Sequence, residues 1–121
     1  MSHTLGQQRA KFCLEQLEKL ECPRDEFKNF SAGLPAMILQ NGFGQALAFL
    51  AAKSSGKDKK HSSAFTIIAS WLHRQNLIQS VRTVDVLTEV SSMTQDKYLH
   101  AQKETLAMLE WLKRYANAEL F

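Results

Sequence analysis

The sequence contains few residues that interrupt or cross-link a chain: two prolines, five glycines and two cysteines among 121 residues. Scarce proline and the small number of β-branched runs argue against a sheet and favour an all-helical protein. On one helix, Cys13 and Cys22 would lie about 13 Å apart, which is too far for a disulfide bond. We therefore expect two free thiols, as in a reducing cytoplasm.

Long apolar runs are also missing. The longest stretch without a charge, residues 34–52, is a poor candidate for crossing about 30 Å of hydrocarbon, because it contains Pro35, Gln40, Asn41, Gly42, Gly44 and Gln45. The first residues, MSHTLGQQRAKF, lack the apolar centre of a signal peptide. We expect a cytoplasmic protein with no membrane segment, and the length predicts a single domain over residues 1–121 with one core.

The net charge of +3 is confined to one short segment. Basic and acidic residues balance in residues 1–52 and again in residues 62–121. Between these parts, in KSSGKDKKH, one acidic residue stands among four lysines: Lys53, Lys57, Lys59 and Lys60. Charge alone leaves two interpretations open, contact with a polyanion or a solvated loop that keeps the protein in solution.

The helical spacing of apolar residues predicts an all-α, single-domain bundle of five to six helices. A capping-box pattern at residues 4–7 opens the first helix, which we expect to end near Glu21, before Cys22 and Pro23. Further helical segments are expected over residues 24–32, 37–41, 45–53, 62–79, 84–90 and 95–117. The predicted inward positions include Leu5, Phe12, Cys13, Leu17, Phe27, Leu47, Phe49, Leu50, Phe65, Ile68, Leu72, Val84, Val90, Ala101 and Met108.

Two glycines interrupt the most apolar stretch of the chain, at Gly42-Phe43-Gly44. Asn41-Gly42 predicts a left-handed stop of one helix, and Gly44 or Gln45 begins the next. Two explanations of the glycines stay open: a plain corner between helices, or close approach by a neighbouring segment. In both cases we expect Phe43 to be displayed at the corner and not buried.

No catalytic or metal-binding constellation is recognisable in the sequence. Neither Glu104 nor Glu110 belongs to an E-x-x-H pattern, and Cys13 lies in an apolar stripe, which indicates an inert core thiol. The four histidines have no second ligand at metal-binding spacing: His3, His61, His73 and His100. We therefore expect no metal, no cofactor and no catalytic residue, and favour a binding or structural protein.

One stretch resembles a known family. LPAMILQNGFGQALAFLAAKSSGK follows the pattern L-P-x-M-I-x-x-N-G-x-G-Q-x-L-A-F-L-x-x-K and is similar to the small helical subunit of the type III-B CRISPR effector, the Cmr complex. RAKFCLEQLEKL, the basic loop and WLKRYANAEL also fit this family, so the resemblance covers the whole chain. The family's Asn-Gly-x-Gly corner matches Asn41, Gly42 and Gly44, with Gln45 after it, and implies a structural role for the glycines. It assigns no contact to Phe43.

The resemblance implies a non-catalytic, all-helical subunit that acts in antiviral defence. Copies of such a subunit stack head to tail along a filament of backbone subunits, which holds the guide RNA while the target RNA pairs with it. The implied partners are the other effector subunits, further copies of the chain itself, and guide and target RNA. Basic side chains would contact phosphates, and the candidates are Lys53, Lys57, Lys59, Lys60, Arg74, Arg82, Lys113 and Arg114.

Two other classes of protein stay open. Residues 83–91 and the long helix after them can be read as a helix-turn-helix that binds DNA. The would-be recognition helix is neutral, however, since Lys97 and Lys103 are offset by Asp96 and Glu104. A small metal-independent ribonuclease would use His73 or His100, but one histidine lacks the second proton-transfer group.

Overall fold

The computed structural model describes residues 2–56, 59–118 and 120, and these residues form helices without any strand. The helices are α1 (Leu5–Glu18), α2 (Arg24–Ala32), α3 (Leu34–Asn41), α4 (Phe43–Lys53), α5 (Lys60–Arg74), α6 (Thr83–Ser91) and α7 (Gln95–Asn117). The predicted all-α class is confirmed. The described residues contain seven helices. Only Gly42 separates α3 from α4, so the number is six if these two are counted as one interrupted helix.

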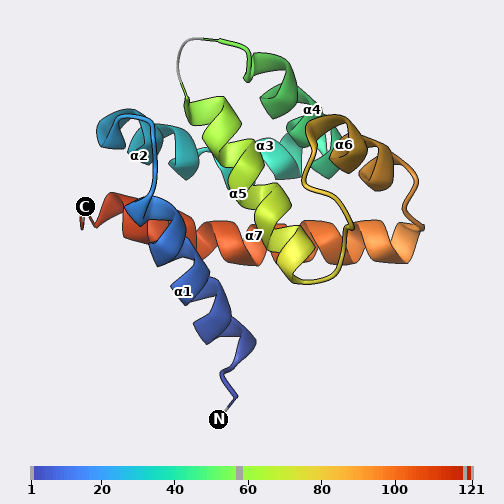
Figure 1. Cartoon of the computed structure of the whole chain (residues 1–121), viewed down its shortest axis with the longest axis horizontal. Helices are drawn as coiled ribbons and strands as arrows, with labels where there is room; N and C mark the ends of the chain where they lie inside the picture. Colours follow the sequence, from blue (N-terminus) through green and yellow to red (C-terminus); the bar gives the residue numbers. More distant parts are fainter. Residues whose placement is uncertain (1, 57–58, 119, 121) are drawn as a thin grey trace.

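The longest helix, α7, is the element on which most of the others pack. It contacts α1, α2, α3 and α5, whereas α6 packs mainly on α4. Figure 1 shows α7 running across the lower half of the molecule, with α5 crossing over it and α1 extending beyond it. The side of α7 that faces these helices buries Ala101, Glu104, Thr105, Met108, Leu109 and Leu112.

The start of α1 follows the local sequence, and its end depends on the turn that follows. The Thr4 hydroxyl accepts a hydrogen bond from the Gln7 amide, and the Gln7 side chain accepts one from the Thr4 amide, so the predicted capping box is confirmed. The prediction that this helix reaches Glu21 is wrong, because α1 ends at Glu18. The chain turns there and brings Cys22, which is 4% exposed, into the core.

The end of α5 also differs from the prediction. The apolar pattern predicts a helix over residues 62–79, but α5 ends at Arg74. Asn76 adopts a positive φ of 62°, and the Leu77 amide reaches back to donate to the Leu72 carbonyl at 2.9 Å. This is a left-handed helix stop made by asparagine in place of glycine. The apolar pattern continues past the stop because Ile78 is buried outside the helix.

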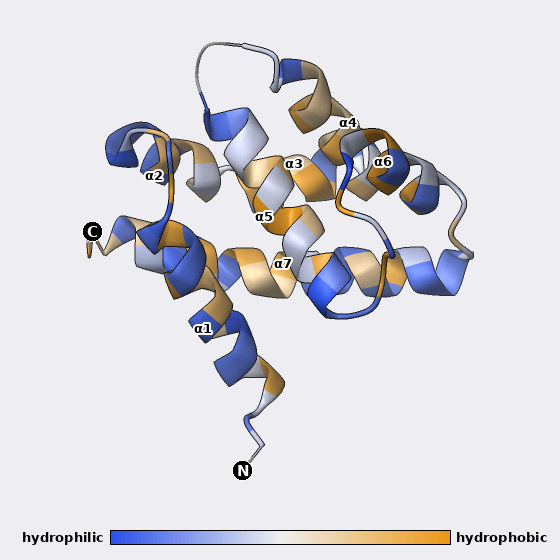
Figure 2. Ribbon diagram, viewed as in Figure 1, coloured by the Kyte–Doolittle hydropathy of each residue, from blue (hydrophilic) through white to orange (hydrophobic). Residues whose placement is uncertain are grey.

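Buried side chains from all these helices meet in one hydrophobic cluster. Figure 2 shows hydrophobic residues along α3 and in the middle of α5, between α4 and α7. Three predicted inward positions are wrong, since Leu5, Phe49 and Val84 are 40%, 41% and 64% exposed. Leu5 and Val84 lie in the first turns of their helices, beyond the body of the core. Phe49 lies on the outer side of α4, where its ring packs against His61.

Candidate nucleic-acid interface

Gly42 forms the corner between α3 and α4. Its φ of 91° lies in the left-handed half of backbone space, which only glycine adopts readily. A Cβ atom on Gly44 would lie 3.3 Å from the Tyr98 hydroxyl oxygen, so this second glycine permits a close approach. Both explanations of the glycine pair therefore hold. Gly42 makes the corner between the two helices, and Gly44 allows the close approach of a neighbouring segment.

The prediction that Phe43 is displayed at this corner is wrong. Phe43 is fully buried, and its ring meets the Tyr98 ring edge to face with centroids 5.8 Å apart. The positive φ of Gly42 turns the first residue of α4 toward α7, where the core takes up the phenyl ring. On the outer side, Asn41 and Gln45 are exposed and line a shallow hollow of about 590 Å³ together with Met37 and Phe49.

The structure brings the described lysines of the basic segment to two helix ends. Lys53 is the last residue of α4, and Lys59 and Lys60 stand at the start of α5. These two ends lie on the side of the molecule away from α7 (Figure 1). The Lys60 ammonium group lies 5.7 Å from the centre of the Phe30 ring, a cation–π contact. Lys57 lies outside the described residues.

The amino terminus of α5 is electropositive beyond its lysines. Among the described residues, no side chain caps it, and no acidic residue stands in its first turn. The backbone amides of a first helical turn have no partner inside the helix, and the helix dipole adds a partial positive charge. Lys59 and Lys60 therefore stand where a helix disfavours cations, and an anion bound there would relieve this repulsion.

The other predicted basic residues do not join this segment. Arg74 lies at the opposite end of α5 from Lys60, about 21 Å away by helical rise. Its guanidinium packs over the Phe12 ring, 4.8 Å from the centroid, and lies 3.9 Å from the Glu15 carboxylate. Arg82 is paired with Asp85 at 3.4 Å.

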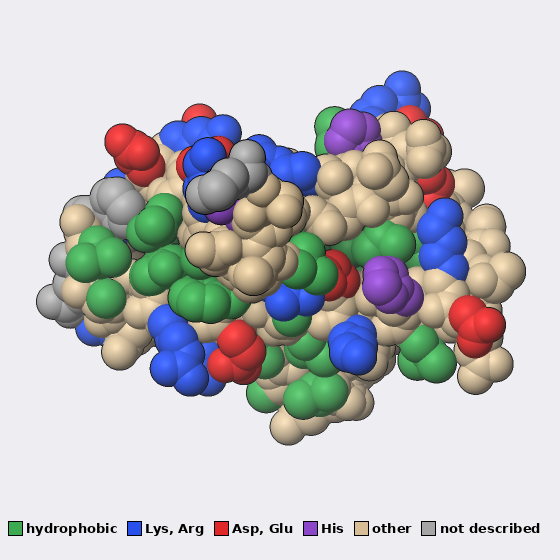
Figure 3. Space-filling model, turned by 90° about the horizontal axis from the view of Figure 1, so that it is seen from below, with side chains coloured by type: hydrophobic (Ala, Val, Ile, Leu, Met, Phe, Trp, Pro, Cys, Tyr) green, Lys and Arg blue, Asp and Glu red, His purple; other side chains and the backbone are tan. Residues whose placement is uncertain are grey.

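Lys113 and Arg114 lie in the last turns of α7. The face shown in Figure 3 carries Lys and Arg at separate places, interspersed with acidic and hydrophobic side chains. The Lys and Arg side chains of this face therefore form no continuous basic surface. By their positions in the helices, the predicted contacts within the described residues divide into several small groups.

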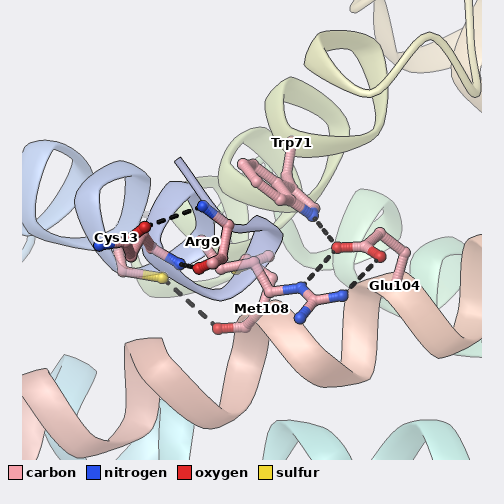
Figure 4. A network of polar contacts seen from close by, with 7 residues as sticks. Arg9, Cys13, Trp71, Glu104 and Met108 are labelled. Atoms are coloured by element: carbon pink, nitrogen blue, oxygen red, sulfur yellow. Dashed lines mark hydrogen bonds and ion pairs between the residues drawn. The ribbon is translucent and has the colours of Figure 1, made fainter. Parts of the chain in front are cut away.

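A buried polar network joins α1, α5 and α7, and sequence reasoning missed it. Arg9 donates two hydrogen bonds to the Glu104 carboxylate, at 2.7 and 2.9 Å, and the Trp71 indole donates a third at 3.0 Å (Figure 4). The hydrogen bond from Arg9 is the main cause that lowers the pKa of Glu104, and it also raises the pKa of Arg9. The sequence does contain one indication that Glu104 is buried: it lies three residues after Ala101, on the apolar stripe of its helix.

Cys13 lies beside this network and is chemically quiet. Its thiol donates a hydrogen bond to the Met108 carbonyl oxygen at 3.4 Å (Figure 4). Burial raises the pKa of Cys13 to about 12, so the thiol stays protonated at neutral pH. Cys13 and Cys22 form no disulfide bond with each other, as the sequence predicts, and both are buried. Cys13 is the inert core thiol expected from its stripe.

Residues 2–56, 59–118 and 120 contain neither a metal-binding cluster nor a membrane-spanning helix. Within these ranges, no three His, Cys, Asp or Glu side chains come together as a metal site would require. None of the helices there combines the length and the hydrophobicity that a bilayer span needs.

A family model described as "CRISPR-associated protein (Cas_Cmr5)" matches residues 5–119. The chain belongs to this Cmr5 family. The resemblance seen in residues 34–53 is therefore confirmed, and it identifies a small subunit of the type III-B Cmr complex. Membership also implies other components of that complex as partners.

Two relatives, both from Thermus thermophilus, show how far the Cmr5 likeness extends. The CRISPR system Cmr subunit Cmr5 of this organism is 27% identical over 95 residues, which cover 78% of this chain and 75% of the relative. An X-ray crystal structure of a CRISPR-associated Cmr5 family protein matches with a TM-score of 0.78 and 24% identity. That match covers 99% of this chain and 100% of the other, and it shows a shared fold.

Proposed function

We propose that this Cmr5 family chain is a non-catalytic subunit of the type III-B RNA-targeting effector and contacts the phosphates of guide and target RNA. Copies stack along the backbone filament in the cytoplasm and take part in antiviral defence. The observation that carries the proposal is the family match over residues 5–119. The lysines at the α4 and α5 ends, with the uncapped start of α5, support the RNA contact.

The electrostatics of this end suit an anion such as a phosphate group. Backbone amides at a helix start point at a bound anion, and the dipole favours negative charge there. Lys59 and Lys60 add two full charges at the same end, and Lys53 adds a third from the end of α4. Contacts of this kind position a nucleic acid without reading its sequence, which a subunit that serves many guides needs.

The contacts of one copy are few, so one copy binds RNA weakly. Several copies held on one filament bind the same strand with a high effective concentration, and weak contacts then sum to a strong one. Cleavage of the target falls to other subunits in this proposal.

The helix-turn-helix alternative is disfavoured by the packing of α7. A recognition helix must enter the major groove along one exposed side, but α7 is the packing platform for α1, α2, α3 and α5. For the ribonuclease alternative, neither His73 nor His100 hydrogen-bonds to another side chain within the described part of the chain. No observation therefore favours either alternative.

Co-purification tests the proposal directly. The tagged chain, expressed in its own host, should recover other effector subunits together with a discrete guide RNA. An unrelated protein of similar size with the same tag controls for passive capture. Recovery of the chain alone would contradict the proposal, and metal-independent cleavage of RNA by the purified chain would revive the ribonuclease.

A further inference from the structure

A polar groove of about 480 Å³ runs between α1 and α5. Gln16 lines it from α1, Lys19 and Arg74 supply cations, and Glu21 supplies the one carboxylate of the lining. The hydroxyl residues of the lining all come from α5: Ser62, Ser63, Thr66 and Ser70. Sequence reasoning assigned no role to these hydroxyl residues or to Gln16.

Three of the four hydroxyl groups make no hydrogen bond within the described residues. In a helix, Ser and Thr usually bond back to a carbonyl of the preceding turn. Ser62 does so, and so do three residues at α6, which are Thr88, Ser91 and Ser92. Within the described residues, Ser63, Thr66 and Ser70 make no such bond. Their spacing of three and four residues places them in a row along one side of α5, over about 10 Å.

Gln16 lines the opposite side of the groove, on α1. It is only 8% exposed. Its side-chain amide makes no hydrogen bond within the described residues and is not among the buried atoms that lack a partner, so it stays open to the groove. An amide from α1 and a row of hydroxyl groups from α5 therefore line one groove, and both are accessible to a ligand there.

The groove also links two of the separate basic groups. It follows α5 from the turn after Lys59 and Lys60 toward Arg74 at the other end. Arg74 is held in place there by the Phe12 ring and Glu15. A strand bound by the first group can thus reach the second by lying along this groove.

The chemistry of the lining distinguishes it from the lysine segment. Lys and Arg only donate hydrogen bonds, whereas hydroxyl and amide groups both donate and accept. A phosphate oxygen only accepts, but the ribose 2′-hydroxyl does both and is the group by which a protein separates RNA from DNA. We infer that this groove binds about three nucleotides of an RNA backbone and selects RNA over DNA through its 2′-hydroxyls. This inference rests on the proposed function and adds a selectivity to it.

The test uses the full-length chain and two probes that differ only at the 2′ position, a short oligouridylate and the matching oligodeoxyuridylate. Titrations are followed by amide signals in NMR, which detects the weak binding of a single copy. We expect the ribo-oligomer to shift the backbone amides of Ser63, Thr66 and Ser70 and the side-chain amide of Gln16. We expect the deoxy-oligomer to bind about two- to tenfold more weakly, which is the loss caused by one missing hydrogen bond.

Three variants separate the possible outcomes. S63A/T66V/S70A should lower the affinity for the ribo-oligomer to that for the deoxy-oligomer and leave the latter unchanged. The matched control T88V/S91A/S92A also removes one threonine and two serine hydroxyl groups, from α6 and its C-cap. It should keep the preference for the ribo-oligomer over the deoxy-oligomer. K53A/K59A/K60A should weaken both probes equally.

Equal affinities of the wild-type chain for the two probes would overturn the inference, as would an equal loss of both in S63A/T66V/S70A. Signals that shift only around Lys53, Lys59 and Lys60 would overturn it while leaving the proposed function intact. If neither region responds to either probe, the inference and the proposed RNA contact both fail.

Discussion

The Tyr98 hydroxyl acts as the amino-terminal cap of α4. It accepts a hydrogen bond from the Gly44 amide at 2.7 Å, although the two residues are 54 positions apart. A cap is usually the side chain of the residue just before the helix, but that residue is Gly42 and has none. α7 therefore supplies a partner that α4 cannot supply itself, and this ties the glycine corner to the central helix.

We expect Tyr98→Phe to lower the free energy of unfolding by about 1–2 kcal/mol, because the part-buried Gly44 amide loses its acceptor. The ring contact with Phe43 is retained in this variant. Denaturant titration of the two proteins measures the difference. Tyr115→Phe is the matched control on the same helix, since the Tyr115 hydroxyl makes no hydrogen bond within the described residues. Indistinguishable unfolding of the two variants would show that the cap has no energetic role.

We expect Gly42→Val to destabilise the fold by about 1–3 kcal/mol, because a β-branched residue is strained at the φ of 91° found there. Thermal melting is the measurement. Gly33→Val is the control, because Gly33 also separates two helices but has an ordinary φ of −92°. An unchanged melting midpoint in Gly42→Val would mean that the corner relaxes without cost.

The Arg9–Glu104 pair predicts a pH dependence of stability. The pKa of Glu104 is lowered in the fold, chiefly by the hydrogen bond from Arg9. A lowered pKa adds stability that is fully present above the unfolded value, about 4.3 for Glu. This stability is lost as the pH falls through the folded value. We therefore expect the wild-type chain to lose unfolding free energy on acidification below about pH 4.

Glu104→Gln isolates this contribution. We expect it to cost about 1–3 kcal/mol at neutral pH, less than a fully buried pair would, because the Arg9 side chain is 20% exposed. The variant should also lose less stability than the wild type below about pH 4. Glu110→Gln, at an exposed position of the same helix, controls for the general loss of a carboxylate. Parallel pH profiles for the wild type and Glu104→Gln would count against the assignment.

Local features of the fold could be predicted from the sequence, and features made by distant segments could not. The Thr4 cap and the positive-φ stop at Gly42 depend on neighbouring residues alone, so the residue types predict them. The burial of Phe43 depends on where α7 passes, and the Arg9–Glu104 pair joins residues 95 positions apart. Apolar periodicity locates a stripe on each helix but does not show which helix faces it.

The candidate site divides in the same way. A count of charges was enough to find the lysine segment, because its excess is local. Ser63, Thr66 and Ser70 read in the sequence as an ordinary solvated side of a helix. They line a groove only because α1 passes beside them, and the buried Gln16 reveals this.

The last prediction concerns K53A/K59A/K60A in the assembled effector. Folding should be intact, because the exposed Lys53 and Lys59 contribute little. The half-buried Lys60 loses one cation–π contact with Phe30 but also stops repelling the start of α5. Target RNA capture should weaken, because each phosphate contact releases counterions and adds a slope of about −0.7 in log K against log salt for a single strand. If all three lysines contact phosphates, their loss should flatten the slope by about two units. RNA affinity at several salt concentrations is the measurement.

K11A/K97A/K103A is the matched control for this variant, because it removes the same charge from three exposed lysines on α1 and α7. It should keep the wild-type salt slope, since long-range attraction alone is screened within about 10 Å at moderate salt. Equal slopes for the two triple variants would mean that the lysine segment acts only through net charge. The phosphate contacts would then have to lie along α5, at Arg74 and the groove beside it, and S63A/T66V/S70A in the same complexes would show whether they do.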